Sequence, residues 1–499
     1  MCGIAGMAGR PLPGAGSEAV IRRMLDRQKH RGPDGRQFWV APGGSAGLGH
    51  DRLAIIDLAG GVQPISNEDG TIVAVVNGEI YNHMALRRRL EGRHTFRTRS
   101  DSEVVLHLFE EEGPDFVRHL DGMFAIALYS TVHGLLLARD PLGIKPLYYG
   151  HDAAGNLLFA SEIKALAPEV PAVNELPPGT VLPGGAGEPE PYYSLPHPTH
   201  ELADAEEAAD LLDHLLARAV EKRLMADVPL GCFLSGGLDS SLITAMAARL
   251  AGERLHTFSV GLEGSADIDN ARRVAAYLGT EHHERVLTPA EVIEAVPQVI
   301  DLLESCDPAL VRSAVPTMYV AQLASAYVKV ALSGEGADEL FAGYHYLDAF
   351  SDEALDDELL LMTGAMHNLN FQRADRMTMA HGLEARVPFM DLAMVEAAFR
   401  TAPALKRSGG EGKWILRKVA ERYLPVDIVW RTKEKFAIGT GIGPLLEQHA
   451  EEQVPAPAGW AAEAWWYWTE FRRRYGRNDL VDGMGRSRSL NPGQFVGRQ

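Results

Sequence analysis

The sequence predicts two domains: an α+β domain over residues 1–200 and an α/β domain with a parallel sheet over residues 201–499. The chain has 499 residues, which is more than one hydrophobic core usually serves. Short isolated apolar runs before residue 200 give way to apolar runs that alternate with amphipathic helices. A segment rich in proline, glycine and glutamate, residues 177–198, separates the two patterns and predicts a junction near 195–205.

Composition narrows the kind of protein. Hydrophobic residues make up 46% of the chain, and the formal net charge is −19. That charge argues against nonspecific binding to nucleic acid or to an anionic membrane, because both need a basic face. The sequence contains no secretory signal and no apolar run long enough to span a bilayer, so we expect a soluble cytoplasmic protein. Its 3 cysteines lack C-x-x-C spacing, so neither a disulfide framework nor a zinc knuckle is expected.

Strands and two helices are predicted in the first domain. The strands are short apolar runs bounded by Gly, Pro, Asn or Asp, at residues 53–57, 71–77, 124–129 and 134–138. One helix is expected at 84–90. A second is expected after Ser100, because Ser100 and Glu103 have the spacing of a capping box.

Helices and strands alternate in the second domain. An amphipathic helix is predicted over 206–224, followed by a strand at 228–234 and a helix at 242–250. Further strands are expected at 255–261 and 328–332. This order predicts a parallel sheet, whose ligands bind at the carboxyl ends of the strands.

The loop "SGGLDSS" begins at Ser235, directly after a predicted strand. Gly236 and Gly237 allow a tight turn with exposed N–H groups, and Ser235 and Ser240 add hydroxyl donors at a helix N-terminus. These groups form a cradle for an anion. No lysine follows as in the G-x-x-x-x-G-K-[ST] loop, so direct γ-phosphate transfer is not indicated. The loop resembles the pyrophosphate-binding loop of enzymes that cleave ATP to AMP and pyrophosphate; the alternative is an ordinary tight turn.

A second loop rich in glycine and acidic residues, "LSGEGADELFAGY" at 332–344, also follows an apolar strand. Glu335 and Asp338 are candidate ligands or orienters of Mg²⁺, which triphosphate chemistry usually requires and which prefers carboxylate and phosphate oxygens. Asp239 could meet the same ion from the first loop. Taken singly, each of these carboxylates would be interpreted as a helix cap or a surface charge. Because two glycine-rich acidic loops both follow strands, a metal-binding role is favoured instead.

With these residues in view, the chain resembles the family of glutamine-hydrolysing asparagine synthetases. In that family a class II (N-terminal nucleophile, Ntn) amidotransferase is fused to an ATP-pyrophosphatase synthetase domain. The resemblance rests on ordered motifs over about 430 residues: "MCGIAG", "HRGPD", "NGEIYN", "SDSE", "RDPLGIKPLYY", "SEIKAL", "LSGGLDSS", "LSGEGADELFAGY", "GLEARVPFMD" and "WRTKEKF". The tail beyond about residue 445 carries no signal. The resemblance implies an Ntn-hydrolase sandwich of αββα layers followed by the ATP-pyrophosphatase fold with extra helices.

The resemblance implies a glutaminase site in the first domain. Removal of Met1 would leave Cys2 with a thiol and a free α-amine, whose ordinary pKa of about 7.7 to 8.0 suits a base. The thiolate would attack the amide of glutamine, releasing ammonia. The oxyanion hole maps onto Asn77 and Gly78, and the glutamine-binding residues map onto Arg52, Asn77, Glu79 and Asp101. Asp101 also lies in the first turn of a predicted helix, where an acid is favourable for another reason.

The resemblance implies an adenylating site in the second domain, with ATP as substrate and Mg²⁺ as cofactor. Lys433 and Glu335 match its catalytic residues. The ATP-binding positions are Leu234, Ser235, Gly236, Gly237, Asp239, Ser240, Val260, Ser333 and Gly334, with Asp239 and Asp338 on the metal. Arg312, Glu384 and Arg386 match positions near the acceptor, which is aspartate in the family. Kinship also implies an apolar passage for ammonia and a homodimer.

Two segments depart from the family pattern and leave the identity of the acceptor substrate open. The segment "DPALV" before Arg312 and the segment "EKFAIGTG" after Lys433 are less polar than in the bacterial relatives. Aspartate stays the leading acceptor. The alternatives are the same mechanism on another carboxylate or with hydroxylamine, and, more remotely, an inactive nucleotide-binding scaffold. His282 and His283 are expected to form a hydrogen-bonded or solvated pair, since no second ligand cluster has metal-binding spacing.

Overall fold

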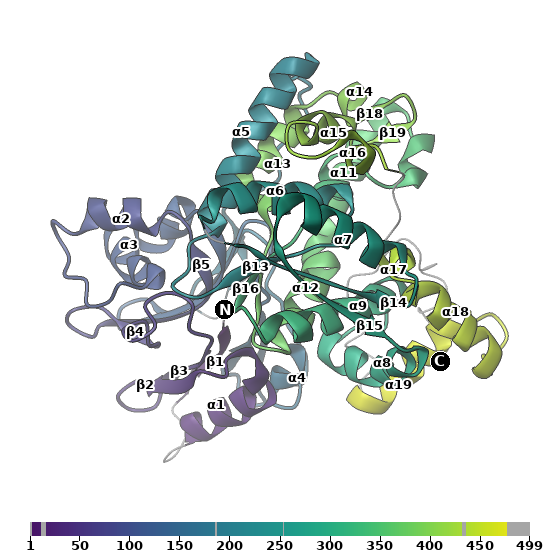
Figure 1. Ribbon diagram of the computed structural model, residues 1–499. Coiled ribbons are helices and arrows are strands. Elements are labelled where there is room, and N and C mark those ends of the chain that lie inside the picture. The colour runs from purple at the N-terminus through teal and green to yellow at the C-terminus, as the bar shows by residue number, and fades with distance from the viewer. Residues whose placement is uncertain (1, 11–15, 185–186, 253, 432–435, 477–499) are drawn as a thin grey trace. The chain divides into compact units, whose positions relative to one another are not determined.

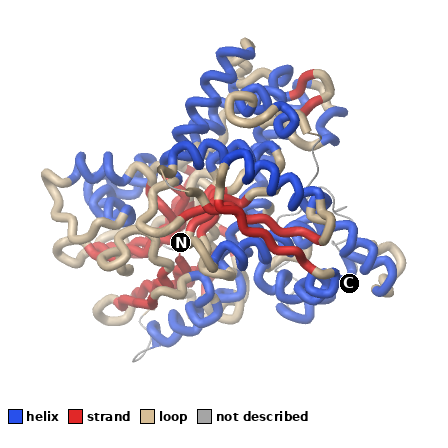
Figure 2. The backbone as a smooth tube through the Cα atoms, in the orientation of Figure 1, coloured by secondary structure: helices blue, strands red, loops and turns tan. Residues whose placement is uncertain are grey.

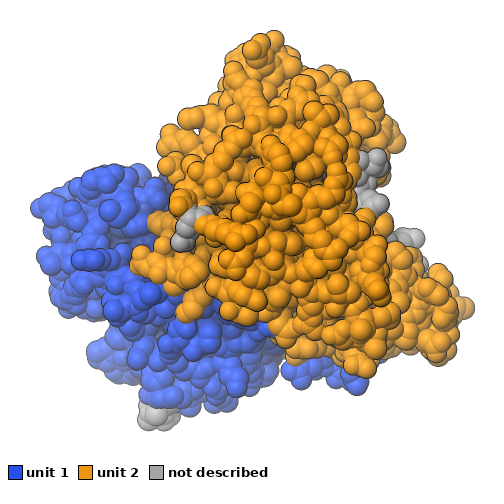
Figure 3. Space-filling view, viewed as in Figure 1, with its two compact units in different colours: residues 1–194, 379–383, 472–485 blue, residues 195–378, 384–471, 486–499 orange. Residues whose placement is uncertain are grey.

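The computed structural model describes the chain except residues 1, 11–15, 185–186, 253, 432–435 and 477–499. It divides into two compact units, shown in two colours in Figure 3. The first unit holds residues 1–194, 379–383 and 472–485, and the second unit holds the remainder. Figure 1 labels the helices and strands.

The first unit is built on two six-stranded sheets whose paired strands are all antiparallel. One sheet has the order β10 (Asn174–Glu175), β8 (Tyr148–His151), β9 (Leu157–Ala160), β1 (Cys2–Ala8), β3 (Ala46–Arg52), β2 (Gly35–Val40). The other has the order β12 (Glu190–Pro191), β11 (Thr180–Leu182), β7 (Gly134–Arg139), β6 (Gly122–Ser130), β5 (Ile72–Ile80), β4 (Ile65–Ser66). The helices of this unit are α1 (Gly16–Arg27), α2 (His83–Leu90), α3 (Val104–Glu112) and α4 (Ile163–Leu166), with 3₁₀ turns η1 (Lys29–Arg31), η2 (Asp101–Glu103) and η3 (Gly113–His119).

Alternation along the strands produces the layers of the first unit. On β5, Val73 and Val75 belong to a core shared with residues of the other sheet, whereas Ala74 and Val76 belong to a core shared with α3. Successive side chains of a strand point to opposite faces, so one strand can serve both cores. Helix α1 covers the outer face of the first sheet, where Gly47 leaves room for it: a Cβ there would lie 2.5 Å from Ile21. The result is the predicted αββα sandwich.

The second unit is built on a five-stranded parallel sheet (Figures 1 and 2). Its order is β15 (Glu281–Leu287), β14 (His256–Leu262), β13 (Leu230–Phe233), β16 (Val330–Leu332), β17 (Glu384–Arg386), and a small hairpin joins β18 (Arg407–Ser408) to β19 (Glu411–Gly412). The helices are α5 (Ala205–Arg223), α6 (Leu238–Leu250), α7 (Ala266–Leu278), α8 (Pro289–Leu303), α9 (Pro308–Ser325), α10 (Ala337–Leu340), α11 (Asp352–Ala365), α12 (Asn370–Met379), α13 (Leu392–Arg400), α14 (Pro403–Lys406), α15 (Trp414–Ala420), α16 (Val426–Val429), α17 (Phe436–Gly439), α18 (Ile442–Gln453) and α19 (Ala462–Tyr475), with 3₁₀ turns η4 (His345–Ala349), η5 (Met366–Asn368) and η6 (Pro388–Met390).

Most predicted elements are confirmed, and the two-domain fold class with them. The expected strand at 53–57 is wrong, because β3 already ends at Arg52 and the residues beyond it form a loop. The expected capping box is also wrong. Ser100 does cap the helical segment, but its side chain accepts a hydrogen bond from the Ser102 N–H, and Glu103 accepts from the N–H groups of Arg97 and Thr98. None of the helices in the described ranges is long and apolar enough to cross a membrane.

Candidate active sites

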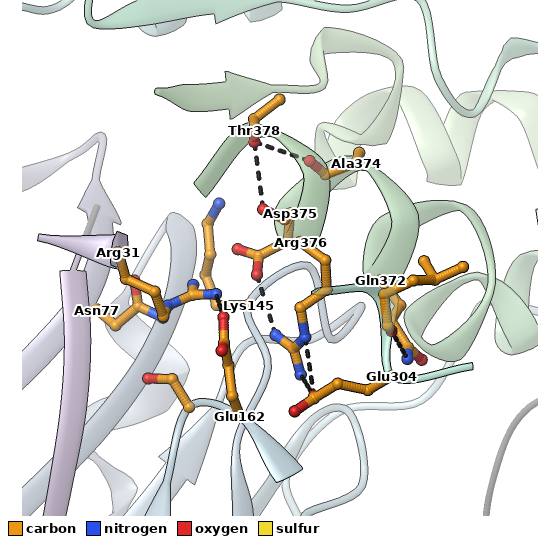
Figure 4. Close-up of polar contacts among 12 residues, drawn as sticks. Arg31, Asn77, Lys145, Glu162, Glu304, Gln372, Ala374, Asp375, Arg376 and Thr378 are labelled. Atoms are coloured by element: carbon orange, nitrogen blue, oxygen red, sulfur yellow. Dashed lines mark hydrogen bonds and ion pairs between the residues drawn. The ribbon is translucent and has the colours of Figure 1, made fainter. Parts of the chain in front are cut away.

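Cys2 begins the strand β1 and lies inside the first unit. The residue is buried, and in the sheet it is the direct partner of Arg52 on β3. Its backbone N–H donates to the side-chain oxygen of Asn77 over 3.0 Å, and its carbonyl accepts from Arg31 over 3.1 Å. Arg31 is held in turn by the buried carboxylate of Glu162, 2.9 Å away (Figure 4). The backbone of Cys2 is therefore held in place on both its N–H and its carbonyl side.

Asn77 on β5 presents an unused donor beside Cys2. Its Oδ1 accepts from Cys2, whereas its buried Nδ2 has no hydrogen-bond partner among the residues that the structure describes. The next residue, Gly78, has φ +156, and a Cβ there would lie 2.0 Å from the carbonyl oxygen of Met123. Only glycine can take this position. The pair has the chemistry of the predicted oxyanion hole, which is a set of N–H donors fixed before charge develops.

Of the three residues predicted to clamp the glutamine, Arg52 ends β3, Glu79 lies near the end of β5, and Asp101 begins η2. Arg52 donates to the carbonyl oxygens of Asp57 and Leu58, over 2.7 and 2.9 Å. Glu79 on β5 is buried, and Asp101 accepts a hydrogen bond from the Ile80 N–H over 2.8 Å. Asp101 thus fixes the start of η2 against β5, and Ser100 rather than Asp101 is the cap.

A cavity of about 860 Å³ lies at the carboxyl ends of the parallel strands of the second unit. Of the predicted ATP-binding and metal positions, its lining includes Leu234, Ser235, Gly237, Asp239, Ser240, Val260, Ser333, Gly334 and Asp338; the predicted catalytic Glu335 also lines it. Gly236 lies behind the wall in the turn itself, with φ +70 and a position at which a Cβ would meet the backbone of Asn270 at 2.5 Å. The turn requires glycine there.

The two glycine-rich loops approach each other closely. A Cβ on Gly334 would lie 2.8 Å from the backbone N of Ser240, so the second loop packs directly on the N-terminus of α6. The hydroxyl groups of Ser235 and Ser240 share one hydrogen bond within the first loop, with 3.2 Å between their oxygens. Hydroxyls and N–H groups of both loops therefore face the same cavity, as an anion cradle requires.

Lys413 joins the two predicted metal ligands, and sequence reasoning missed it. Its Nζ lies 2.7 Å from Asp239 and 2.8 Å from Asp338. Burial lowers the pKa of Lys413, but the two carboxylates outweigh it and the net pKa is raised, so the ammonium stays charged. Lys413 has φ +55, a strained backbone for a residue with a Cβ. Strain of this kind concentrates at functional sites, and the loop context of Lys413 in the sequence offers no comparable signal.

Asp239 and Asp338 fit a magnesium ion by their chemistry. Their oxygens come from the two separate loops and converge on one cationic group, the Lys413 ammonium. Carboxylates in this number, completed by phosphate oxygens and water, are the ligands Mg²⁺ takes at nucleotide sites.

Other charged side chains of the cavity wall also escaped the sequence analysis. Arg373 donates to Glu335, the predicted catalytic acid, and Arg431 lies in the wall as part of the "WRTKEKF" motif. Glu339 accepts from the Tyr344 hydroxyl over 2.6 Å, and burial, with Asp338 nearby, raises the pKa of Glu339 to about 7. The cavity therefore carries arginine and lysine cations beside its acids, which suits a polyanionic ligand despite the net negative chain.

The predicted acceptor-binding residues do not line this cavity. Arg312 donates to both carboxylate oxygens of Glu463, over 2.8 and 2.9 Å. Arg386 is fully buried, pairs with Glu384 at 2.5 Å and donates to two backbone carbonyls, while its neighbour Ala385 reaches the cavity wall. The structure thus gives both guanidinium groups protein partners. Lys433, the other predicted catalytic residue, lies outside the described residues.

The two less polar segments do reach the cavity. Ala309 and Leu310 come from the first segment, and Phe436 and Ala437 come from the second. Asp307, also in the first segment, is used as the cap of α9, where it accepts from the N–H groups of Ala309 and Leu310. The wall is therefore apolar where these segments meet it.

Comparison with known proteins gives consistent matches along the chain. The family model described as a glutamine amidotransferase domain matches residues 1–181, and the one described as asparagine synthase matches residues 211–354 and 347–479. The glutamine-hydrolysing asparagine synthetase of Asparagus officinalis is 41% identical over 478 residues, covering 91% of this chain and 80% of the relative. Asparagine synthetase B of Escherichia coli (strain K12), also described as glutamine-hydrolysing, is 40% identical over 447 residues, covering 85% and 80% respectively.

Proposed function

Because the chain belongs to the family of glutamine-hydrolysing asparagine synthetases, we propose that it is an ATP-dependent amidotransferase that makes asparagine from aspartate. Glutamine supplies the nitrogen and ATP supplies the activation. The products are asparagine, glutamate, AMP and pyrophosphate. The enzyme is a carbon–nitrogen ligase with one site in each unit.

The glutaminase half-reaction uses Cys2 as nucleophile. Its α-amine, free once Met1 is removed, takes the thiol proton directly or through a water. The thiolate attacks the side-chain amide carbon of glutamine, and the developing oxyanion accepts hydrogen bonds from Asn77 Nδ2 and the Gly78 N–H. Ammonia leaves, and water hydrolyses the thioester to glutamate. Arg52 binds the α-carboxylate of glutamine, and Glu79 and Asp101 bind its α-amine.

The synthetase half-reaction takes place in the cavity of the second unit. The loop at Ser235–Ser240 binds the pyrophosphate portion of ATP, and Leu234 and Val260 contact the adenosine. The β-carboxylate of aspartate attacks the α-phosphorus, pyrophosphate leaves, and ammonia then displaces AMP from the acyl-adenylate. Lys433, from the "WRTKEKF" motif, stabilises phosphate charge in this step.

Magnesium would be held by Asp239 and Asp338 together with the triphosphate. When bound, it neutralises charge on the leaving pyrophosphate. The protein's own cations act alongside it: Lys413 keeps the two carboxylates at a fixed separation, with its Nζ within 2.8 Å of each.

The buried N–H of Asn77 Nδ2, left without a partner beside Cys2, is the observation that carries the glutaminase assignment. The complete reaction is tested by incubating the chain with glutamine, ATP and Mg²⁺, with and without aspartate. Pyrophosphate, glutamate and asparagine are followed. We expect pyrophosphate and asparagine in equal amounts, both dependent on aspartate. Glutamate formation without any aspartate-dependent pyrophosphate would rule out aspartate as acceptor.

A second candidate is the same reaction on a less polar carboxylate. It is favoured by the apolar wall contributed by Ala309, Leu310, Phe436 and Ala437, and by the absence of Arg312 and Arg386 from the cavity lining as described. The same assay decides between the two. In separate reactions, aspartate is replaced by each member of a panel of monocarboxylates and dicarboxylates, and glutamine is replaced by hydroxylamine. The acceptor is the one that gives the highest kcat/KM for pyrophosphate release.

A further inference from the structure

Two histidines and two glutamates come together in the first unit, on elements that neither active site uses. Glu68 lies in the turn between β4 and β5, and His94 lies in the segment between α2 and η2. His107 and Glu110 share one face of α3, three residues apart. One ligand atom of each of the four lies within 4.8 Å of those of the others. Three separate stretches of chain are thus brought to a single point.

Four nitrogen–oxygen distances in this cluster lie near the edge length of a tetrahedral zinc site. Zinc bound at about 2.0 to 2.1 Å in tetrahedral geometry places its ligand atoms about 3.3 to 3.4 Å apart. From Glu110 Oε2 the distances are 2.9 Å to His107 Nδ1 and 3.3 Å to His94 Nδ1. Glu68 Oε2 lies 3.7 Å from His107 Nδ1, and Glu68 Oε1 lies 3.9 Å from His94 Nδ1. The Glu110 distances lie at or below the tetrahedral edge and the Glu68 distances lie above it, so the Glu68 carboxylate has to move inward to bind the ion.

The hydrogen bonds around His94 favour a cation at the centre. Its Nε2 lies 2.8 Å from Glu111 Oε1, and its Nδ1 lies 3.3 Å from Glu110 Oε2. In the tautomer that donates its N–H to Glu111, the Nδ1 lone pair faces the Glu110 carboxylate. A cation between the two, either a proton or a metal ion, removes the repulsion between them. A histidine ligand commonly donates its other N–H to a carboxylate, as His94 does to Glu111.

Further contacts hold the remaining ligands in place. Glu68 Oε1 accepts from the Thr95 N–H over 2.7 Å, and Glu110 Oε1 accepts from Asn67 over 2.9 Å. The rings of His94 and His107 stack, with their centroids 4.7 Å apart. His107 is buried, with 1% of its side chain exposed, whereas Glu68 at 35% leaves a path for an ion. The ligands are therefore positioned before an ion arrives.

We propose that Glu68, His94, His107 and Glu110 form a structural site for a zinc ion. Imidazole and carboxylate ligands suit zinc, and four protein ligands close the coordination sphere, which is the arrangement of structural rather than catalytic sites. The ion cross-links the turn at Glu68, the segment at His94 and the helix α3. It has no part in either half-reaction.

The test is zinc binding to the full-length chain after dialysis against a chelator, with Mg²⁺ in excess to occupy the nucleotide site. We expect one zinc per chain, and a rise in Tm of roughly 5 to 10 °C at a free zinc concentration a hundredfold above Kd. The variant carrying His94→Gln with Glu110→Gln should bind at least about tenfold more weakly and lose the rise in Tm. His151→Gln, an exposed histidine of the same unit on β8, is the matched control and should change neither.

Besides the nucleotide site, two other places among the described residues could hold a zinc ion, and the experiment separates them. His256, Glu281 and His283 form a smaller cluster of three in the second unit, so loss of the bound zinc in His283→Gln would overturn the proposal. The thiol of Cys2 is the other. X-ray absorption at the zinc edge is measured on the unaltered chain, so it does not depend on whether a variant folds. We expect nitrogen and oxygen ligands at about 2.0 to 2.1 Å from the zinc, including two imidazoles. A sulfur ligand, or no stoichiometric zinc, would also overturn the proposal.

Discussion

The buried side-chain amide of Asn77 lies beside Cys2 with only one of its two ends engaged. Leaving a buried N–H without a partner costs on the order of 1 to 3 kcal/mol. Asn77 Nδ2 is such a group, while the oxygen of the same amide is engaged by Cys2. The orientation of the amide is thereby fixed, and the donor side is left for a ligand. An unpartnered donor beside the proposed nucleophile Cys2 is what preorganised charge stabilisation requires.

Asn77→Asp should remove this donor and keep the shape. The carboxylate can still accept from the Cys2 N–H, but it cannot donate to an oxyanion. We expect kcat for glutamine hydrolysis to fall about 10²- to 10³-fold, and synthesis from added ammonia to continue. Asn82→Asp, in the same "NGEIYN" motif, makes the same charge change away from Cys2 and should retain most of the activity. A loss of less than threefold in Asn77→Asp would remove Asn77 from the oxyanion hole.

Pyrophosphate formation in the second unit should depend on Lys413. Lys413→Met leaves Asp239 and Asp338 facing each other without the ammonium that lies within 2.8 Å of both. Their repulsion and the altered loop spacing should reduce pyrophosphate formation at least about 10²-fold, with glutamine hydrolysis unchanged. Lys418→Met, one turn along on the exposed face of α15, is the control. Pyrophosphate release at the unaltered rate in Lys413→Met would show that the ion pairs are dispensable.

At the scale of elements, the short helix α14 buries a charge at a cost. Lys406 at its end is fully buried, its nearest acid is Asp356 with Oδ1 3.8 Å away, and Phe399 packs over its Nζ. Burial lowers the pKa of Lys406 to about 8, against a small opposing effect of Asp356. Asp356 is itself hydrogen-bonded to His200. An ammonium held this far from its counter-ion opposes folding below pH 8.

Lys406→Met should therefore stabilise the chain by about 1 to 3 kcal/mol near neutral pH. The direction of the pH dependence follows from proton binding at Lys406. Between pH 8 and the ordinary lysine pKa near 10.4, Lys406 is protonated in the unfolded state and deprotonated in the folded state. The free energy of unfolding of the unaltered chain therefore rises with pH across that range, and the advantage of Lys406→Met shrinks. Thermal unfolding from pH 6.5 to 9.5 measures it, with Lys418→Met as the exposed control. A difference that stays constant across this range would contradict the lowered pKa.

Local pattern predicted most elements, and the misses have physical reasons. The segment at 53–57 is apolar enough for a strand, but β3 ends at Arg52 because that side chain turns to hold the carbonyls of the following loop. Lys413 lies 174 residues from Asp239 in sequence, so no spacing rule could pair them. Glu68 and His107 likewise meet only through the fold. Contacts set by chain topology leave no periodic trace in the sequence.

At the scale of the whole molecule, each of the two units carries one of the two candidate sites on its own scaffold. The residues predicted for glutamine hydrolysis lie in the first unit on β1, β3, β5 and η2, and the described residues of the nucleotide site lie in the second unit at the ends of its parallel strands. Each unit contains its own buried ion pair, Arg31 with Glu162 in one and Arg376 with Glu304 in the other (Figure 4). The chemistry of the two sites can therefore be separated by substitution.

Cys2→Ala makes that separation testable. The variant lacks the nucleophile but keeps every group of the second unit, so glutamine-dependent asparagine synthesis should fall at least about 10³-fold. Synthesis from ammonium salts, measured at a pH high enough to supply free ammonia, should stay within about twofold of the unaltered chain. Cys306→Ala removes another buried thiol and should retain glutamine use. Glutamine-dependent synthesis that survives in Cys2→Ala would mean that another residue attacks the amide, and loss of the ammonia-dependent reaction would mean that the second site needs Cys2 for its structure.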